Sequence, residues 1–195
     1  TEQTIYNLSG EGSVNKSGAG EVIISGNNKD FSGNIKVNEG SLLYENIKDY
    51  SSEDTSYISG ITELTTGTQF NAKVDGVDDV INGTFLGYGN FIKTGIGTLT
   101  FEGDLKGLTG DMSVNSGIFE FVKSADNGYI QGDTNGLSGA EFIYNTNGNN
   151  AELNQDITGN GNFTKDGSGT LTLNGDYSNL TGNTTIKDGI LNYIL

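Results

Sequence analysis

Three groups of side chains in this sequence could do chemistry: a set of lysines, an acidic run, and a segment that combines carboxylates with a tyrosine. The lysines Lys16, Lys93 and Lys165 occupy matching places in three similar stretches of the chain. If matching places stack every three coils of a β-sheet rod, the lysines would form a row about 14 Å apart. Such a row could bind an acidic glycan, but nearby carboxylates favour local ion pairs instead (Glu21, Glu102 and Asp166).

The acidic run is DGVDD, residues 75–79. Its carboxylates Asp75, Asp78 and Asp79 are the oxygen ligands that Ca²⁺ prefers. The run lacks both the twelve-residue EF-hand spacing and the glycine-rich nonapeptide of calcium β-rolls. We therefore predict a solvated loop here, and no metal site in the chain.

The third group lies in residues 45–56, where Asp49, Tyr50, Glu53 and Asp54 alternate with serines and a threonine. An aromatic ring beside carboxylates and hydroxyls can contact a sugar or a protein surface. The alternative is a solvated spacer with no ligand. We predict these four residues as the candidate binding site and keep both interpretations.

Catalysis and several ligand classes are disfavoured by composition. The chain has no His, Cys or Arg, so a nucleophile with an adjacent base is hard to build. Glycosidase chemistry needs paired carboxylates about 5–9.5 Å apart in a groove, and nothing places Asp78 and Asp79, or Glu53 and Asp54, in one. The net charge of −15 makes nucleic acid a poor partner. We predict no enzyme, no cofactor and no membrane insertion, since no apolar run reaches the length of a span.

The elements that must position these groups are short strands joined by glycine turns. Apolar and polar residues alternate over runs such as residues 170–173 and 190–193, which is typical of half-buried strands. Three gap-free copies of one pattern occupy residues 8–44, 85–121 and 157–193. The irregular segments 45–84 and 122–156 also recur, so the repeating unit is about 72 residues long. The first interval is longer by about five residues, which we place in residues 45–56, outside the stacked core.

A long repeat of short strands without a helix signal favours a parallel β-helix over a β-propeller, whose repeats are shorter. We predict an all-β fold of 8–9 coils, with about 24 residues in each coil and three coils in each unit. The rod would be on the order of 40 Å long. The alternation predicts inward side chains at six positions that keep one phase in every copy (Leu99, Phe101, Val114, Leu171, Leu173 and Ile186).

The pattern G-x-G-x-[FV]-x-K-x-G-x-G-T-L-T-[LF] resembles the passenger-associated transport repeat of bacterial autotransporters. Residues 87–119 and 159–191 match it closely, whereas the first copy replaces Thr-Leu-Thr by Glu21-Val22-Ile23. The resemblance implies a right-handed parallel β-helix outside a Gram-negative outer membrane and a role for the repeat in passenger secretion and folding.

On this basis residues 1–195 are predicted to be one β-helix segment of a longer adhesin passenger, acting as a stalk and binding scaffold. It would be a monomer at the cell surface, tethered through a translocator barrel outside this sequence. Its partner would be a surface protein or glycan of a host cell or a partner bacterium. The alternative function is that of a glycan-degrading or glycan-binding β-helix.

Overall fold

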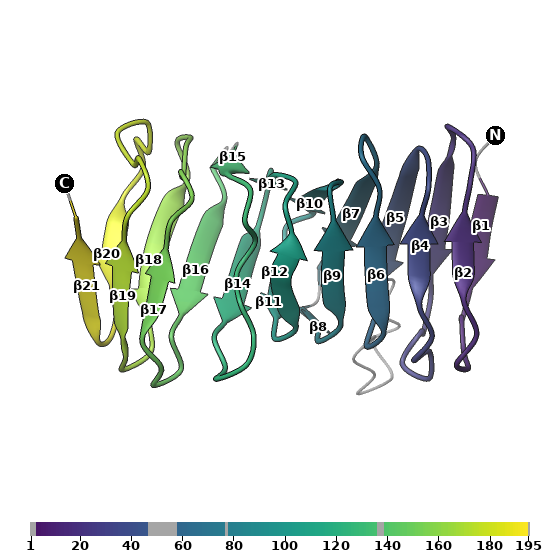
Figure 1. Cartoon of the computed structure of the whole chain (residues 1–195), viewed down its shortest axis with the longest axis horizontal. Helices are drawn as coiled ribbons and strands as arrows, with labels where there is room; N and C mark the ends of the chain where they lie inside the picture. The colour runs from purple at the N-terminus through teal and green to yellow at the C-terminus, as the bar shows by residue number, and fades with distance from the viewer. Residues whose placement is uncertain (1–2, 47–57, 77, 136–138, 195) are drawn as a thin grey trace.

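Short strands joined by glycine turns wind into one rod. In the computed structural model, which describes residues 3–46, 58–76, 78–135 and 139–194, the chain is an all-β parallel solenoid of about eight turns. The coils lie side by side along the long axis, with the two termini at opposite ends (Figure 1). In the described residues no helix is long and apolar enough to cross a membrane.

Every described strand pairs in parallel with a strand of an adjacent coil, and four sheets result. The seven-stranded sheet contains β1 (Gln3–Tyr6), β3 (Glu21–Ser25), β5 (Ser41–Asn46), β7 (Gln69–Val74), β10 (Asn90–Thr94), β13 (Met112–Val114) and β15 (Thr134–Asn135). The five-stranded sheet contains β2 (Val14–Lys16), β4 (Ile35–Val37), β6 (Ile61–Leu64), β9 (Thr84–Gly87) and β12 (Asp104–Leu108). The six-stranded sheet contains β8 (Asp79–Ile81), β11 (Thr98–Phe101), β14 (Ile118–Val122), β16 (Glu141–Asn145), β18 (Asn162–Asp166) and β20 (Thr184–Ile186). The three-stranded sheet contains β17 (Ala151–Leu153), β19 (Thr170–Leu173) and β21 (Ile190–Tyr193).

The coil is shorter than the length of about 24 residues predicted from the repeat. Phe70 lies opposite Phe91 and Phe91 opposite Met112, so a coil takes about 21 residues. One coil is long, because Lys73 in β7 lies opposite Glu45 in β5, and these two residues are 28 residues apart in sequence. The extra length predicted for the first unit therefore belongs to this coil, which runs from β5 to β7.

The repeating unit also does not hold a whole number of coils, contrary to the prediction of three. On one face of the rod Phe91 pairs with Met112, Met112 with Thr134, and Thr134 with Ile157. Ile157 therefore lies three coils after Phe91. The position that matches Phe91 in the next copy is Phe163, which comes after Ile157 and lies in β18 of the six-stranded sheet. Each copy of the repeat is thus turned by one face of the rod relative to the copy before it.

The alternation of side chains predicts the core well. Leu99, Phe101, Val114 and Leu171 are fully buried and Leu173 is 5% exposed, as the phase of the strands requires. Ile186 is different, at 53% exposed. It pairs in register with Lys165, as Val37 and Val114 pair with Lys16 and Lys93. Among the described residues β20 is an end strand of its sheet, so correct register does not give burial there.

Aromatic rings fill the centre of the rod and link its coils. Phe70 and Phe91 stack with their ring centroids 5.5 Å apart, and Phe119 follows at 6.0 Å from Phe91. Phe142 lies 5.8 Å from Phe119 and 5.4 Å from Phe163. A narrow core of this kind buries much apolar area per residue, which explains how a chain with 33% hydrophobic residues can fold.

Candidate functional site: the lysine-capped turns

The four residues predicted as a binding site, Asp49, Tyr50, Glu53 and Asp54, lie outside the described residues. In the sequence they fall between β5 and β7, whose paired residues are 28 apart. Their role in binding stays a prediction.

The acidic run does not form a single cluster. Asp79 is fully buried in β8, where its Oδ1 accepts a hydrogen bond from the amide of Val80 at 2.8 Å. The Oδ1 of Asp78 accepts from the amide of Thr98 on the next coil at 2.9 Å, and Asp75 lies 3.3 Å from the ammonium of Lys73. In the described ranges no three His, Cys, Asp or Glu side chains lie close enough together to hold a metal ion.

We expect the thermal midpoint of this protein to be the same with and without EDTA, because a chelator can only remove stability that a bound metal adds. Differential scanning fluorimetry in the presence of EDTA, and again after addition of Ca²⁺, measures this. A fall of many degrees that Ca²⁺ reverses would contradict the prediction and direct attention to Asp75 and Asp78.

The three matching lysines share one geometry, and it is neither a row nor a set of ion pairs. Each side chain enters the rod two residues after an inward residue of the same strand, and each is 4% exposed or less. The Lys93 Nζ donates to the carbonyl oxygens of Thr94 at 3.0 Å, Gly95 at 2.9 Å and Ser116 at 3.1 Å. An ammonium group has three hydrogens to donate, so three carbonyls satisfy it.

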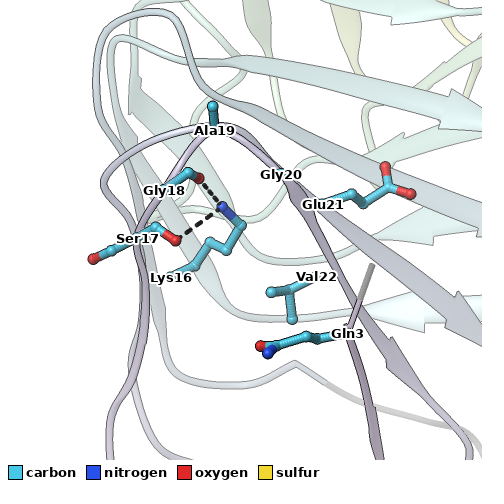
Figure 2. A pocket seen from close by; sticks show the side chains of 8 residues that line it. All are labelled: Gln3, Lys16, Ser17, Gly18, Ala19, Gly20, Glu21 and Val22. Carbon is cyan, nitrogen blue, oxygen red and sulfur yellow. Dashed lines mark hydrogen bonds between the residues drawn. The ribbon is translucent and has the colours of Figure 1, made fainter. Parts of the chain in front are cut away.

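The other two lysines repeat this arrangement at the same sequence offsets. The Lys16 Nζ donates to Gly18 O at 2.5 Å and Glu39 O at 2.8 Å, and Ser17 O lies at 3.5 Å. Figure 2 shows the Lys16 side chain curled under its own turn, beside an open hollow at the amino-terminal end of the rod. The Lys165 Nζ lies within hydrogen-bond distance of four oxygens, the carbonyls of Asp166, Gly167 and Asp188 and the Thr146 hydroxyl, which share its three hydrogens.

We call this arrangement the lysine clasp. Two of its acceptors belong to the turn that follows the lysine, and the third, 23 residues later, belongs to the next coil. Lys16, Lys93 and Lys165 lie in β2, β10 and β18, which belong to three different sheets. The predicted row of lysines is therefore wrong, because each copy of the repeat is turned by one face. The predicted ion pairs with the carboxylates of Glu21, Glu102 and Asp166 are also wrong, since carbonyl and hydroxyl oxygens accept the hydrogen bonds of the lysines.

Burial lowers the lysine pKa in two of the clasps. It lowers the pKa of Lys93 to about 8, against the attraction of the Asp75 and Asp78 carboxylates. Burial likewise lowers the pKa of Lys165, opposed by Asp188 and Asp166. At neutral pH the Lys93 ammonium is still protonated and can donate to all three carbonyls.

A glycine completes each clasp. Gly40, Gly117 and Gly189 follow the third carbonyl directly, and their φ angles of 71°, 69° and 73° lie in the left-handed region that favours glycine. At Gly117 a Cβ would also lie 2.5 Å from the carbonyl oxygen of Gly95. The glycine thus lets the next coil approach closely enough for its carbonyl to reach the lysine.

A second device that joins the coils was not predicted from the sequence. At one corner of the rod, side-chain oxygens of Asn90, Asp111, Asp133 and Asp156 each accept a hydrogen bond from the amide of the next member, one coil later. The four N···O distances are 3.0, 3.1, 3.1 and 2.7 Å, ending at Asp176 N. The sequence does contain a pattern that could have revealed it: a Gly-Asn or Gly-Asp dipeptide recurs once per coil, at 89–90, 110–111 and 132–133.

We expect the protein to lose stability as the pH falls below about 4, because carboxylates accept hydrogen bonds from the folded backbone. The amide of Gly167 donates to Asp166 at 2.7 Å and, with the Lys187 ammonium, lowers the pKa of that carboxyl. In the window between the lowered folded pKa and the unfolded value, the unfolded chain binds more protons, so stability decreases as the pH is lowered. Urea unfolding at pH 5 and pH 3 measures the slope. The Asp166→Asn variant should lose part of it, and an equal slope in both proteins would contradict the assignment.

Taken together, these groups hold coils to one another, and neither the clasps nor the corner ladder presents a reactive atom to a substrate. The lysines are buried, and the corner carboxylates accept from backbone amides. Their chemistry is that of assembly: each contact is complete only when the next coil is in place.

The family model described as the passenger-associated-transport-repeat matches three segments of the chain, residues 14–43, 91–120 and 163–192. Neither the search of curated proteins nor that of solved structures gives a match. Each matched segment contains one complete clasp, from the lysine to the carbonyl on the next coil (Lys16 to Glu39, Lys93 to Ser116 and Lys165 to Asp188). A repeat of this kind implies a secreted or surface-exposed protein associated with the outer membrane. The chain thus contains three passenger-associated-transport-repeats, and these repeats, wound into one parallel β-solenoid, fit a passenger segment of an autotransporter.

Proposed function

We propose that this chain is a stalk and binding-scaffold segment of a surface-exposed autotransporter adhesin, held at the outer membrane by a translocator barrel. The observation that carries the proposal is the lysine clasp, which occurs once in each repeat and joins one coil to the next. A rod of stacked coils with paired strands can hold a binding surface at a distance from a membrane without a thick core.

The same clasp suggests how the repeat supports secretion. A coil presents a row of unpaired backbone groups that the next coil can pair with, so a solenoid can grow one coil at a time. The lysine gains its third carbonyl only when the following coil has been added. Each clasp then secures the coils behind it, and folding outside the membrane favours outward movement of the chain.

The partner we propose is a surface protein or a glycan of a host cell or a neighbouring bacterium, bound by a monomeric rod. The net charge of −15 supports this choice over nucleic acid and over anionic membrane surfaces, both of which select for basic patches.

Display on a cell tests the role in folding and secretion. Residues 1–195 are fused to a translocator barrel in a Gram-negative host, and surface exposure and protease resistance of the rod are measured. We expect a protease-resistant rod at the surface, and reduced display when Lys16, Lys93 and Lys165 are all replaced by methionine. The matched control replaces three lysines with more exposed side chains, Lys36, Lys73 and Lys106. Equal display of both triple variants would overturn the role of the clasp.

Adhesion is tested separately. Cells that display the passenger with and without residues 1–195 are compared for attachment to host-cell and bacterial surfaces. A scaffold role predicts weaker attachment when the segment is removed. Unchanged attachment would show that binding does not depend on this part of the rod.

A further inference from the structure

The outer face of the five-stranded sheet carries a groove that runs along the rod. Two hollows of about 390 and 360 Å³ lie end to end on this face, and both are lined by Glu63 and Leu86. The first extends over β9 and β12 to Thr109, and the second extends over β4 and β2 to Asn15. Volumes of this size are within the range of small-ligand sites.

The first hollow lies where glycines leave out side chains. Gly87 and Gly107 lie on its wall, and the register of β9 and β12 shifts between Asp104 and Gly107. A Cβ at Gly107 would lie 3.0 Å from the Cβ of Leu86. The absence of that Cβ leaves the Leu86 side chain as an apolar wall of a depression that is open to solvent.

The lining combines an exposed ring, hydroxyls and a neutralised ion pair. Tyr88 directly follows β9 and is 69% exposed, so most of its ring is free to contact a ligand. Thr65, Thr66 and Thr109 line the same hollow. The hydroxyls of Thr65 and Thr109 already donate to the carbonyls of Asn38 at 2.8 Å and Gly87 at 3.1 Å, so they can accept hydrogen bonds from a ligand. Glu63 lines both hollows and Lys36 lines the second. The Lys36 ammonium lies 2.7 Å from a Glu63 carboxylate oxygen, so these two charges cancel.

We propose that this groove binds a linear, neutral oligosaccharide, an inference that rests on the proposed role of the rod as an adhesin scaffold. The apolar face of a sugar ring packs on an exposed tyrosine, and its hydroxyls bond to threonines and to an ion pair that can both donate and accept. Successive coils along the groove are about 4.8 Å apart, a spacing close to that of successive rings in a linear glycan. The charge of −15 opposes an acidic glycan.

Solution NMR tests this proposal on the ¹⁵N-labelled chain. Cellotetraose, maltotetraose and chitotetraose are added in turn, with sialyllactose as the acidic comparison. We expect at least one of the neutral tetrasaccharides to shift the amide signals of Thr65, Leu86 and Gly87, and sialyllactose to leave them in place. Tyr88→Ala should weaken that binding at least tenfold, whereas Tyr88→Phe, which keeps the ring, should retain most of it.

Tyr6→Ala is the matched control, because Tyr6 is 67% exposed but lies in β1, away from the groove. It should leave the affinity unchanged. The proposal is overturned if none of the neutral sugars shifts the groove amides, if Tyr88→Ala binds as the parent does, or if only sialyllactose binds. In those cases protease-resistant display of the rod would still support its proposed role in secretion, so the two proposals can fail independently.

Discussion

We expect Lys93→Met to lower the free energy of unfolding by about 2–4 kcal/mol. Methionine fills the space of the lysine stem but donates no hydrogen bond, so the carbonyls of Thr94 and Ser116 lose the Lys93 donor inside the rod. Gly95 keeps a hydrogen bond from the Ser116 hydroxyl at 3.2 Å, which moderates the loss. Urea unfolding followed by circular dichroism measures the change.

Lys73→Met is the control for this measurement. The Lys73 side chain is 38% exposed and pairs with Glu45 at 2.7 Å and Asp75 at 3.3 Å. Exposed ion pairs contribute about 0–1 kcal/mol, so this variant should change stability far less than Lys93→Met. Equal effects of the two substitutions would show that the buried lysine is no more important than a surface charge.

The pH dependence gives a second measurement for the same residue. Because burial lowers the pKa of Lys93 to about 8, the unfolded chain holds a proton that the folded chain has released between pH 8 and the unfolded value. The unfolded state then binds more protons, so Lys93 makes the stability rise with pH across this window. The Lys93→Met variant should lack that rise. Parallel stability curves for the two proteins would mean that Lys93 is not the titrating group.

The parallel solenoid could be predicted because its two requirements are local. Alternation at positions such as Leu171 and Leu173 shows which side chains face inward, and glycines mark the turns. The length of a coil is not local. The length of the repeat is the sequence separation of equivalent residues, such as Phe91 and Phe163. The length of a coil is the sequence separation of paired residues in adjacent coils, such as Phe91 and Met112. A turn can pass through three sheets, as β9, β10 and β11 do before β12 returns to the sheet of β9. A repeat unit can therefore end one face away from where it began.

The clasps were misjudged for a related reason. Lysine is usually a surface residue, so a lysine in each copy suggests a charged row on the outside. The alternation along the strand predicts the opposite: Lys93 is two residues from the inward Phe91, so its side chain also points inward. The acceptor cannot be identified from one copy of the repeat. The carbonyl of Ser116 lies next to Lys93 only because the following coil packs directly against the coil of Lys93.

The groove could not be predicted from the sequence at all. Leu86, Gly107 and Thr65 become neighbours through the register of three coils and a shift within one strand pair. The predicted binding residues Asp49, Tyr50, Glu53 and Asp54 came instead from a difference in length between repeats. The structure places that difference in one coil but leaves their role as a prediction.

Several glycines lie against the backbone of the preceding coil, where a side chain would have no room, and Gly110 is an example. An added Cβ at this position would lie 2.1 Å from the carbonyl oxygen and 2.6 Å from the carbonyl carbon of Gly89. Both atoms belong to the backbone of the preceding coil, so no side chain can turn aside to make room. The repeat keeps the same contact in its other copies, with 1.7 Å at Gly33 and 1.9 Å at Gly182.

We therefore expect Gly110→Ala to cost at least about 3 kcal/mol in the free energy of unfolding. The clash is relieved only if the two coils move apart. That movement would lengthen two hydrogen bonds, from Phe91 N to Asp111 O at 2.9 Å and from Asp111 N to Asn90 Oδ1 at 3.0 Å. Gly12 provides the control, since nothing lies within 4 Å of a Cβ there and its φ is outside the left-handed region. Gly12→Ala should change stability by less than about 1 kcal/mol, in the stabilising direction, because alanine restricts the unfolded chain. If urea unfolding gave the two alanine variants the same midpoint, the contact between coils could not be what requires glycine at Gly110.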